Sequence, residues 1–249
     1  MKPNPFSLAD KTILVTGASS GIGRGIAVAC AHMGANVIIT ARNLLRLQET
    51  LAAMPGEGHT ILCADLTDNE QRQQLVEQLP ALDGLVHCAG VGSRVPCKNI
   101  EQSDIDYVLQ PNFMAPVLLQ TELLSAKKIT KAASIVFIAS RAAEMPSAGN
   151  AVYSASKGAI ISYAKCLALE LAPRKIRVNC ICPAMVWTDL VLAGASREQL
   201  EEAEQRYPLK RYGQPEDVAY LAVYMLSDVS TWMTGSCVDI TGGGEGIIA

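Results

Sequence analysis

The sequence has no long hydrophobic run and no strong excess of one charge. No apolar stretch approaches the ~20 residues of a membrane-spanning helix, and the N-terminal segment MKPNPFSLADK lacks the apolar core and cleavage site of a signal peptide. Basic and acidic residues are mixed, the formal net charge is −3, and no basic stripe or RNA-binding aromatic motif is present. We therefore expect a cytoplasmic protein with no membrane and no nucleic-acid partner.

Histidine is scarce, and cysteine lacks the spacing of a metal site. His32, His59 and His87 show no metal-ligand spacing among themselves or with the cysteines. Most of the eight cysteines lie in apolar runs such as ILCADL and VNCICP, where a free thiol behaves as a small hydrophobic group. We expect no metal and no disulfide framework, because disulfides are rare in a long chain without a secretory signal.

Short β-branched runs alternate with longer helical patterns along the 249 residues. The expected strands are 12–17, 36–41, 60–66, 84–90, 134–140, 177–183 and 236–242. The expected helices are 22–33, 43–54, 69–79, 103–127, 151–172, 197–206 and 215–226. Gly34 is expected just after a helix and Asn43 at a helix N-cap.

This alternation predicts an α/β fold with one doubly wound parallel sheet and helices on both faces, because the strands are near-continuous apolar runs. Hydrophobic residues make up 49% of the chain, enough for a sizeable core. No linker, repeat or low-complexity tract interrupts it, so we expect residues 1–249 to form a single domain. Ligands of such sheets bind beyond the carboxyl ends of the strands.

The first expected strand is followed by the glycine-rich segment TGASSGIGRGIA. Gly17, Gly21 and Gly23 have the spacing GxxxGxG, which permits a tight turn, close approach of a pyrophosphate and close packing of helix on sheet. The N–H groups that open the helix from Ile22 would face the anion. A glycine-rich turn that binds no ligand can have the same sequence. The position of this turn between a strand and a helix favours a dinucleotide-binding site.

The second expected strand ends in ITARN, without the acid that binds the ribose 2′-hydroxyl of NAD. Arg42 at this corner suits a 2′-phosphate, although it could be a solvated loop charge. We therefore predict NADP. Asp65, at the end of the third strand, could accept a hydrogen bond from adenine or cap a turn. Ala89 and Gly90, at the end of the fourth, are small enough for backbone contact with the cofactor.

Four polar residues near the later strands suit carbonyl chemistry. Tyr153 and Lys157, at i and i+4, lie on one helix face, where the ammonium favours the phenolate and makes the phenol a usable acid or base. Ser140 ends the fifth strand, and its hydroxyl could bind a substrate carbonyl. Asn112 is a polar residue in the apolar stretch YVLQPNFMAPVLL and needs partners if buried; Pro111 before it predicts a kinked helix.

Together these segments resemble the short-chain dehydrogenase/reductase family over nearly the whole chain. The matching features are TGASSGIG, Asp65, CAG, Asn112, Ser140, Tyr153, Lys157, Pro183, Thr188, PLKRYGQPEDVA and the final TGG. The resemblance implies a Rossmann-type fold and reversible hydride transfer between a nicotinamide and a carbonyl or secondary alcohol. It also implies a homotetramer.

The resemblance assigns roles to individual residues. Tyr153 is the implied acid/base, Ser140 positions the carbonyl, Lys157 holds the ribose and tunes the tyrosine, and Asn112 supports a proton relay. The implied cofactor-binding residues are Gly17, Ser19, Ser20, Gly21, Ile22, Gly23, Arg42, Asp65, Leu66, Ala89, Gly90, Tyr153, Lys157, Pro183, Val186 and Thr188. Two departures from the family, His87–Cys88 for its asparagines and Pro183–Ala184 for its PG, predict altered cofactor fit rather than lost activity.

The substrate is less well defined by the sequence. Residues 185–212 should form a substrate lid with an apolar wall. One interpretation is a reductase of small or moderately apolar carbonyls, such as the xylulose reductase type. Another is a 3-oxoacyl-(acyl-carrier-protein) reductase, which receives an acidic carrier on basic residues near the site mouth. Candidates for that role, or simply solvated helix ends, are Lys127, Lys128, Lys131, Arg174 and Lys175.

A non-catalytic NADP-binding protein is a third interpretation. It is disfavoured because such proteins typically lack the tyrosine or lysine, whereas this chain keeps all four site residues. An epimerase or dehydratase of the extended family is disfavoured by length.

Overall fold

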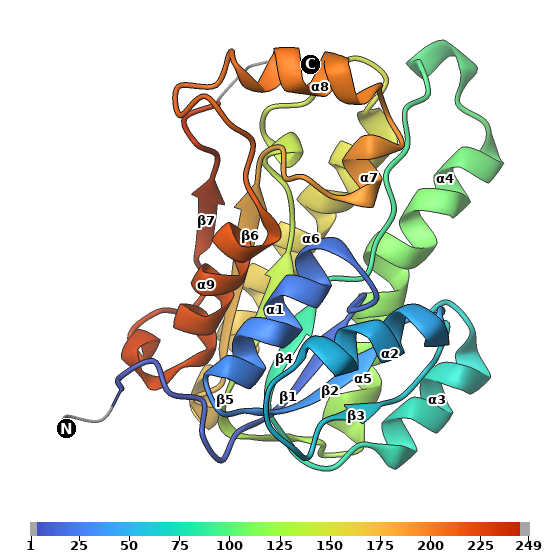
Figure 1. The fold of residues 1–249 in the computed structure, drawn as a ribbon. Coiled ribbons are helices and arrows are strands. Elements are labelled where there is room, and N and C mark those ends of the chain that lie inside the picture. Colours follow the sequence, from blue (N-terminus) through green and yellow to red (C-terminus); the bar gives the residue numbers. More distant parts are fainter. Residues whose placement is uncertain (1–3, 245–249) are drawn as a thin grey trace.

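The computed structural model describes residues 4–244 and contains a parallel sheet of seven strands (Figure 1). The strands are β1 (Thr12–Thr16), β2 (Asn36–Thr40), β3 (Thr60–Ile61), β4 (Leu82–His87), β5 (Ile129–Ile138), β6 (Arg177–Pro183) and β7 (Cys237–Ile240). Their order across the sheet is β3-β2-β1-β4-β5-β6-β7. Because the order reverses between β1 and β4, the loops after these two strands diverge and open a crevice at the carboxyl edge.

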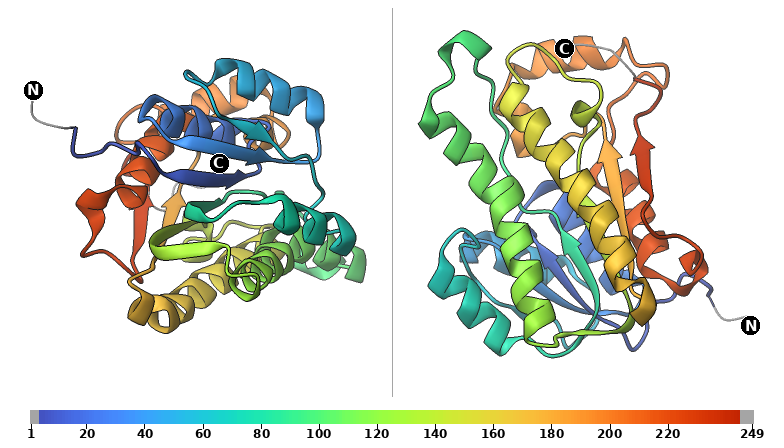
Figure 2. Two further views of the ribbon diagram at one scale, coloured as in Figure 1. Left: turned by 90° about the horizontal axis from the view of Figure 1, so that it is seen from below. Right: turned by 180° about the vertical axis from the view of Figure 1, so that it is seen from behind.

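Helices cover both faces of the sheet (Figure 2). One face carries α1 (Gly21–His32), α2 (Leu44–Ala53) and α9 (Pro215–Leu226); the other carries α3 (Asn69–Gln78), α4 (Gln102–Leu109), α5 (Ala115–Ser125) and α6 (Ala151–Leu171). Strand side chains alternate between the two apolar cores. Ile13 and Val15 pack with α1 and α9, whereas Leu14 packs with α5 and α6. The predicted doubly wound α/β fold is confirmed.

Most expected elements are found within two residues of their expected bounds. Strand β6 and helix α9 match their expected ranges. Asn43 caps α2, because its side chain accepts a hydrogen bond from the backbone N–H of Arg46. Gly34 follows α1 with φ of +90°, a conformation that glycine adopts without steric cost. Short 3₁₀ helices lie at Cys97–Asn99, Arg141–Ala143, Ala172–Arg174 and Asp228–Ser230.

Three strands differ from their expected bounds by more than two residues. Strand β4 ends at His87 rather than at 90, so residues 88–90 belong to the loop after it. Strand β5 begins at Ile129 rather than at 134. The expected start was too late because Lys131 and Ala132 are exposed, so the first part of the strand lacks a continuous apolar run. Strand β3 covers only Thr60–Ile61, although the backbone N–H groups of Leu62 and Ala64 still donate to the carbonyls of Ile39 and Ala41. Strand β3 is an edge strand, paired only with β2, so its end is irregular.

The expected long helix 103–127 is divided by a turn of π-helix, Gln110–Met114, between α4 and α5. Pro111 lies in this turn and has no N–H to donate, which accounts for the break in the regular helical bonding. Such π-turns often occur at functional sites. Here the turn holds Asn112, which is 2% exposed.

Above the carboxyl ends of β6 and β7 lie two further helices, α7 (Asp189–Leu192) and α8 (Arg197–Glu204) (Figure 1). Helix α7 has a single turn, too short for a periodic pattern to reveal. Helix α8 packs on a small separate core formed by Leu200, Ala203, Tyr207 and Tyr212. Within residues 4–244, no helix has both the length and the apolar composition needed to cross a membrane.

Candidate active site

The glycine-rich turn is packed too tightly for any other residue. Gly17 has φ of +66°, and a Cβ there would lie 2.7 Å from the Cα of Ala89 in the loop after β4. A Cβ on Gly23 would lie 2.3 Å from the carbonyl oxygen of Gly17. Both distances are far below van der Waals contact, so the turn needs glycine at both positions.

The N-terminus of α1 is open to an anion. Ser20 is its N-cap, but within the described chain the Ser20 side chain makes no capping hydrogen bond and the first turn holds no acid. The first N–H groups of a helix have no partner inside the helix. The turn therefore fits the pyrophosphate of a dinucleotide, which would be held by backbone N–H groups beside Ser19, Ser20 and Ile22.

Two residues that the sequence analysis missed hold this turn in place. Thr16 is buried, and its hydroxyl oxygen accepts hydrogen bonds from the backbone N–H groups of Cys88 and Ala89, at 3.0 and 3.1 Å. Arg24 donates to the carbonyl of Ser19 at 2.7 Å and to the hydroxyl of Thr50 at 3.0 Å. In the sequence, Thr16 directly precedes the first glycine of the turn and Arg24 lies within GIGRG. These two positions were the signals from which their supporting roles could have been predicted.

The residues that follow the second and third strands lie at the carboxyl ends of the sheet. Arg42 is exposed, two positions after β2 ends and two positions before α2 begins. Asp65 accepts hydrogen bonds from the backbone N–H and the hydroxyl of Thr67 at 2.9 and 2.7 Å, so it caps a turn, one of its two expected roles. Leu66 beside it is buried.

Tyr153 and Lys157 lie one turn apart on α6, as their spacing predicts. The Nζ of Lys157 lies 5.7 Å from the centre of the Tyr153 ring. Lys157 is 7% exposed and donates a hydrogen bond of 2.9 Å to the carbonyl of Ile138 near the end of β5. A strand end thus fixes the ammonium beside the phenol, within the range of a cation–π contact.

Asn112 and Lys157 meet at Gly90. The Asn112 amide donates to the carbonyl of Val91 at 2.9 Å and accepts from its N–H at 2.7 Å, and it also donates to the hydroxyl of Ser156 at 3.1 Å. A Cβ on Gly90 would lie 2.9 Å from the Asn112 Oδ1 and 3.6 Å from the Lys157 Nζ. Gly90, in the loop after β4, therefore lacks a side chain at the place that both polar groups approach.

Ser140 and Arg141 follow β5 at the same edge of the sheet. The Ser140 hydroxyl oxygen accepts a hydrogen bond of 3.1 Å from the N–H of Ala142 and still has a proton to donate. The Arg141 guanidinium pairs with Glu144 and, at 3.0 Å, with Asp239 in β7. Arg141 is thus a structural cation that joins two strand ends.

The five basic residues suggested as a carrier-docking site lie near the amino ends of the strands. The candidate site lies at the opposite, carboxyl ends. Lys127 and Lys128 precede β5, whereas Ser140 follows it, and a ten-residue strand spans ~33 Å. Lys128 donates to the carbonyl of Glu77, and Arg174 donates to the carbonyl of Ile129 at the start of β5. Strand direction places these cations away from the site.

His87 and Cys88, which replace the family's asparagines, are uncharged at neutral pH; His87 is buried and Cys88 is partly buried. The His87 ring stacks on Phe137 with centroids 4.5 Å apart, and its Nε2 lies 3.2 Å from the Gln120 Oε1. Burial lowers the pKa of His87 to about 4, while the Gln120 hydrogen bond acts in the opposite direction. Burial raises the pKa of Cys88 to about 12, opposed by the positive charge of Lys157.

We expect His87 to make the protein less stable as the pH falls from 6.5 to 4. The unfolded chain protonates this imidazole near its ordinary pKa of 6.5, whereas the folded protein does so only near 4. Over this range, the free energy of unfolding of His87→Asn should therefore fall by ~3 kcal/mol less than that of the wild type. Urea denaturation at a series of pH values measures the difference.

The exposed residue His32 provides the control for this experiment, because His32→Asn also removes an imidazole but not a buried one. It should keep the wild-type slope of stability against pH. A wild-type slope in His87→Asn would contradict burial of His87 as the cause.

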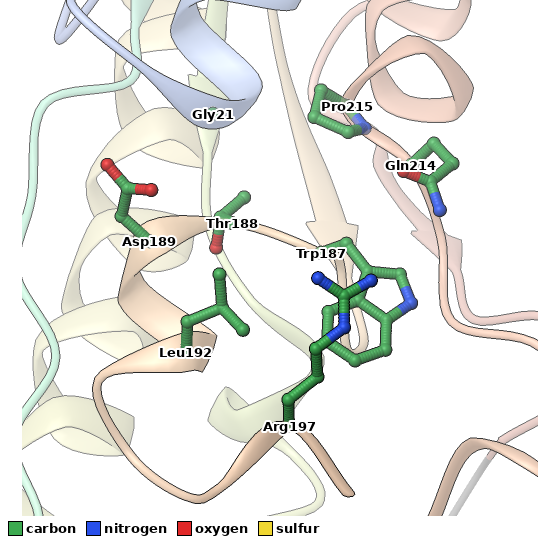
Figure 3. Close-up of a pocket in the computed structure, with 8 residues that line it drawn as sticks. All are labelled: Gly21, Trp187, Thr188, Asp189, Leu192, Arg197, Gln214 and Pro215. Atoms are coloured by element: carbon green, nitrogen blue, oxygen red, sulfur yellow. The ribbon is translucent and has the colours of Figure 1, made fainter. Parts of the chain in front are cut away.

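An open pocket of about 380 Å³ adjoins the glycine-rich turn (Figure 3). Gly21 and Thr188 lie at its edge, and a Cβ on Gly21 would lie 2.9 Å from the Thr188 methyl. Its lining residues are Gly21, Trp187, Thr188, Asp189, Leu192, Arg197, Gln214 and Pro215. Tyr153 and Lys157 are not among them, so this pocket adjoins the glycine-rich turn and not the Tyr–Lys pair.

The segment after β6 is tied down by hydrogen bonds. Val186, buried at 5% exposure, forms an isolated β-bridge with Gly213, and the backbone N–H of Trp187 donates to the Gly213 carbonyl at 2.9 Å. The Glu204 carboxylate of α8 accepts from the Trp187 indole N–H at 2.9 Å and from the backbone N–H of Tyr212 at 3.2 Å. Glu204 thus holds residues 187 and 212 together.

All eight cysteines are free thiols. Among residues 4–244, no group of three or more His, Cys, Asp or Glu side chains is placed to hold a metal ion.

A Rossmann-type sheet with an open dinucleotide turn and a Tyr–Lys pair at its carboxyl edge defines a nicotinamide-dependent oxidoreductase, and comparisons with known proteins agree. The family model described as enoyl-(acyl carrier protein) reductase matches residues 17–245. A 3-oxoacyl-(acyl-carrier-protein) reductase of Rickettsia conorii is 34% identical over 238 residues, covering 96% of this chain and 98% of that protein. An L-xylulose reductase of Caenorhabditis elegans is 34% identical over 248 residues, covering 97% and 98%.

Solved structures show the same likeness. A protein from Beutenbergia cavernae, assigned as an NAD(P)-dependent gluconate 5-dehydrogenase and crystallised with NADP at low occupancy, has a TM-score of 0.87 and 34% identity, covering 96% of this chain and 98% of that one. A short-chain dehydrogenase/reductase from Brucella melitensis has a TM-score of 0.89 and 28% identity, covering 99% and 100%. The chain belongs to the short-chain dehydrogenase/reductase family, whose members act on CH–OH and C=O groups with a nicotinamide cofactor.

Proposed function

We propose that the protein is an NADP(H)-dependent reductase of small or moderately apolar carbonyl compounds. The observation that carries this proposal is the meeting of Asn112 and Lys157 at Gly90, with Lys157 held beside the Tyr153 ring. This arrangement can store, position and deliver a proton at the place where the family reduces a carbonyl.

In this proposal each site residue has one task. Ser140 donates its hydroxyl proton as a hydrogen bond to the substrate carbonyl oxygen, and Tyr153 gives that oxygen its proton. Lys157 stabilises the phenolate that Tyr153 leaves behind. The nicotinamide, when bound, supplies the hydride. Asn112, fixed by Val91 and Ser156, holds the path along which the proton of Tyr153 is replaced from solvent.

The cofactor would lie along the carboxyl edge of the sheet. The backbone of residues 17–23 would hold the pyrophosphate, as the open N-terminus of α1 supports. Arg42 would bind the 2′-phosphate, and Asp65 and Leu66 would flank the adenine. Ala89, Gly90, Pro183 and Val186 would line the nicotinamide half, and Thr188 would lie on the pyrophosphate side. Residues 185–212 would form a lid within a one-domain enzyme, and the bonds to Glu204 would keep α8 attached to it.

The main alternative is a 3-oxoacyl-(acyl-carrier-protein) reductase, the activity named for the Rickettsia relative. The five basic residues suggested as a docking site for an acidic carrier lie at the amino ends of the strands, away from Ser140, which counts against this alternative. A substrate without a protein carrier therefore fits this chain better.

Oxidation of NADPH and of NADH by the purified protein, followed by absorbance, tests this function. The carbonyl panel would hold a ketose, a vicinal diketone and an acetoacetyl thioester. We expect faster oxidation of NADPH, and the Arg42→Gln variant should lose roughly tenfold or more of its preference for NADPH over NADH, because a charge-assisted contact to phosphate is lost.

Different results would change different parts of the proposal. Faster turnover with NADH would contradict the role of Arg42. Preference for the thioester would favour the alternative activity. Tight binding of NADPH without turnover of any carbonyl would favour a binding protein. The cytoplasmic location and the homotetramer stay predictions.

A further inference from the structure

An ion pair joins the corner after β2 to the segment after β6. Arg46, in the first turn of α2, places its guanidinium 2.8 Å from the carboxylate of Asp189, the first residue of α7. Thr188, just before Asp189, lies against Gly21 at the N-terminus of α1. The pair therefore connects the Arg42 corner to the turn that would hold the pyrophosphate. In Figure 3 the Asp189 carboxylate points away from Trp187 and Arg197.

Arg46 lies close in the chain to the arginine proposed to bind the 2′-phosphate. Arg42 and Arg46 flank Asn43, whose side chain accepts a hydrogen bond of 3.0 Å from the backbone N–H of Arg46. Arg42 forms no ion pair with any residue in the range 4–244. The side chains of Arg46 and Asp189 are 50% and 60% exposed. The corner thus presents the cations Arg42 and Arg46, of which Asp189 neutralises the second. Arg24, which donates to the Arg46 carbonyl, is paired with Glu49.

We infer that Arg46 is a second determinant of cofactor choice, shared between Asp189 and the 2′-phosphate of NADP. This inference rests on the proposed NADP(H) function and adds a residue and a competitor to it. A phosphate monoester carries about −1.5 to −2 charge at neutral pH and three acceptor oxygens, and guanidinium binds it in a bidentate manner. The phosphate therefore takes Arg46 from the single carboxylate of Asp189.

The exchange has a consequence for the lid. A half-exposed ion pair is weak in water, so replacing it is easy. When NADP binds, Asp189 is released and the start of α7 loses its connection to α2. When NAD binds, no phosphate reaches Arg46 and the connection stays. In this inference Arg46 therefore has two roles. It binds the 2′-phosphate, and its ion pair with Asp189 determines how firmly α7, at the start of the lid, is attached to α2.

If Arg46 is shared between Asp189 and the phosphate, substitutions of Arg46 and of Asp189 should change the Kd for NADPH in opposite directions. A purely structural ion pair would not give opposite changes. Arg46→Gln removes a cation, so the Kd for NADPH should rise roughly tenfold, with that for NADH changed less than about twofold. Asp189→Asn removes the carboxylate that competes for Arg46, so the Kd for NADPH should fall by roughly threefold. The change is small because an exposed ion pair contributes little free energy. Fluorescence titration of the full chain at low salt measures both constants for each variant.

Three further variants complete the experiment. Lys11→Gln breaks the pair with Asp228, which lies outside the lid, and should leave both constants unchanged, which controls for the loss of a positive charge. Arg46→Lys keeps the charge without the bidentate fork and should lie between wild type and Arg46→Gln. It also provides a second variant if Arg46→Gln folds poorly, which thermal unfolding reports. Arg42→Gln tests the NADP preference itself.

The outcomes separate the two proposals. If Arg46→Gln and Asp189→Asn change the Kd for NADPH in the same direction, or change NADPH and NADH equally, the ion pair is only structural and the inference is wrong. The same holds if neither variant has an effect while Arg42→Gln shifts the ratio of the two constants. An unchanged ratio in Arg42→Gln contradicts the proposed NADP preference instead.

Discussion

Tyr153→Phe is expected to lower kcat for carbonyl reduction by about three orders of magnitude, within the range of general acid catalysis. The substitution removes only the phenol oxygen, which the proposal makes the source of the substrate's proton. The ring remains beside the Lys157 ammonium, so the Kd for NADPH should change less than about threefold. Steady-state kinetics and cofactor titration separate the two quantities.

Tyr163 provides a matched control on the same helix. Its ring lies edge-on to Phe137 at 5.9 Å, and burial, followed by the charge of Glu170, raises its pKa to about 12. Tyr163→Phe likewise removes one phenol oxygen from α6, and we expect it to retain kcat within about threefold, because no step uses that group. Activity of Tyr153→Phe within tenfold of wild type would remove Tyr153 from the reaction.

Lys157→Met should give the second large effect, on both chemistry and cofactor binding. Methionine has a similar length but no charge and no proton to donate to the Ile138 carbonyl, a bond of 2.9 Å in the native protein. We expect kcat to fall by roughly 100-fold or more, because the phenolate of Tyr153 loses its neighbouring cation. The Kd for the cofactor should rise by about tenfold.

The fold should survive this change, because an ammonium that is only 7% exposed is itself costly to bury. Thermal unfolding of Lys157→Met checks that point. Lys165→Met, an exposed position on the same helix, is the control and should retain both constants. Wild-type kcat in Lys157→Met would contradict the role of the charge.

The fold was predictable where side-chain pattern and burial agree. Strand β6 is buried at every position, and its apolar run gave its bounds. The pattern failed where a strand continues through exposed residues, as at Lys131 in β5, and where an element is shorter than one period, as in α7. In both cases backbone hydrogen bonds define the element, and these bonds cannot be inferred from the residue types.

Those parts of the candidate site that are local in the chain were also predictable. Gly17 to Gly23 and Tyr153 to Lys157 are separated by few residues, so helix and turn geometry place them together. The support of Cys88 by Thr16 and the pairing of Arg46 with Asp189 join residues 72 and 143 positions apart. Such contacts depend on strand order, which a single sequence does not specify.

Strand direction also bears on the two interpretations of the basic residues and favours solvated helix ends over a docking site. Lys127 and Lys128 stand before β5, and the carboxyl edge of a parallel sheet lies at the other end of the strand. Their charge and clustering resembled a docking site, but position relative to the strand decides which edge they occupy.

The central claim is that this site transfers a hydride from a nicotinamide to a carbonyl carbon while Tyr153 supplies the proton. The most direct measurement uses NADPH that carries deuterium in place of the transferred hydrogen, with mass spectrometry of the alcohol formed from the preferred carbonyl. The account predicts one deuterium on the carbinol carbon with wild-type protein and almost none formed with Tyr153→Phe. Alcohol without deuterium, or equal labelled product from Tyr153→Phe, would contradict it.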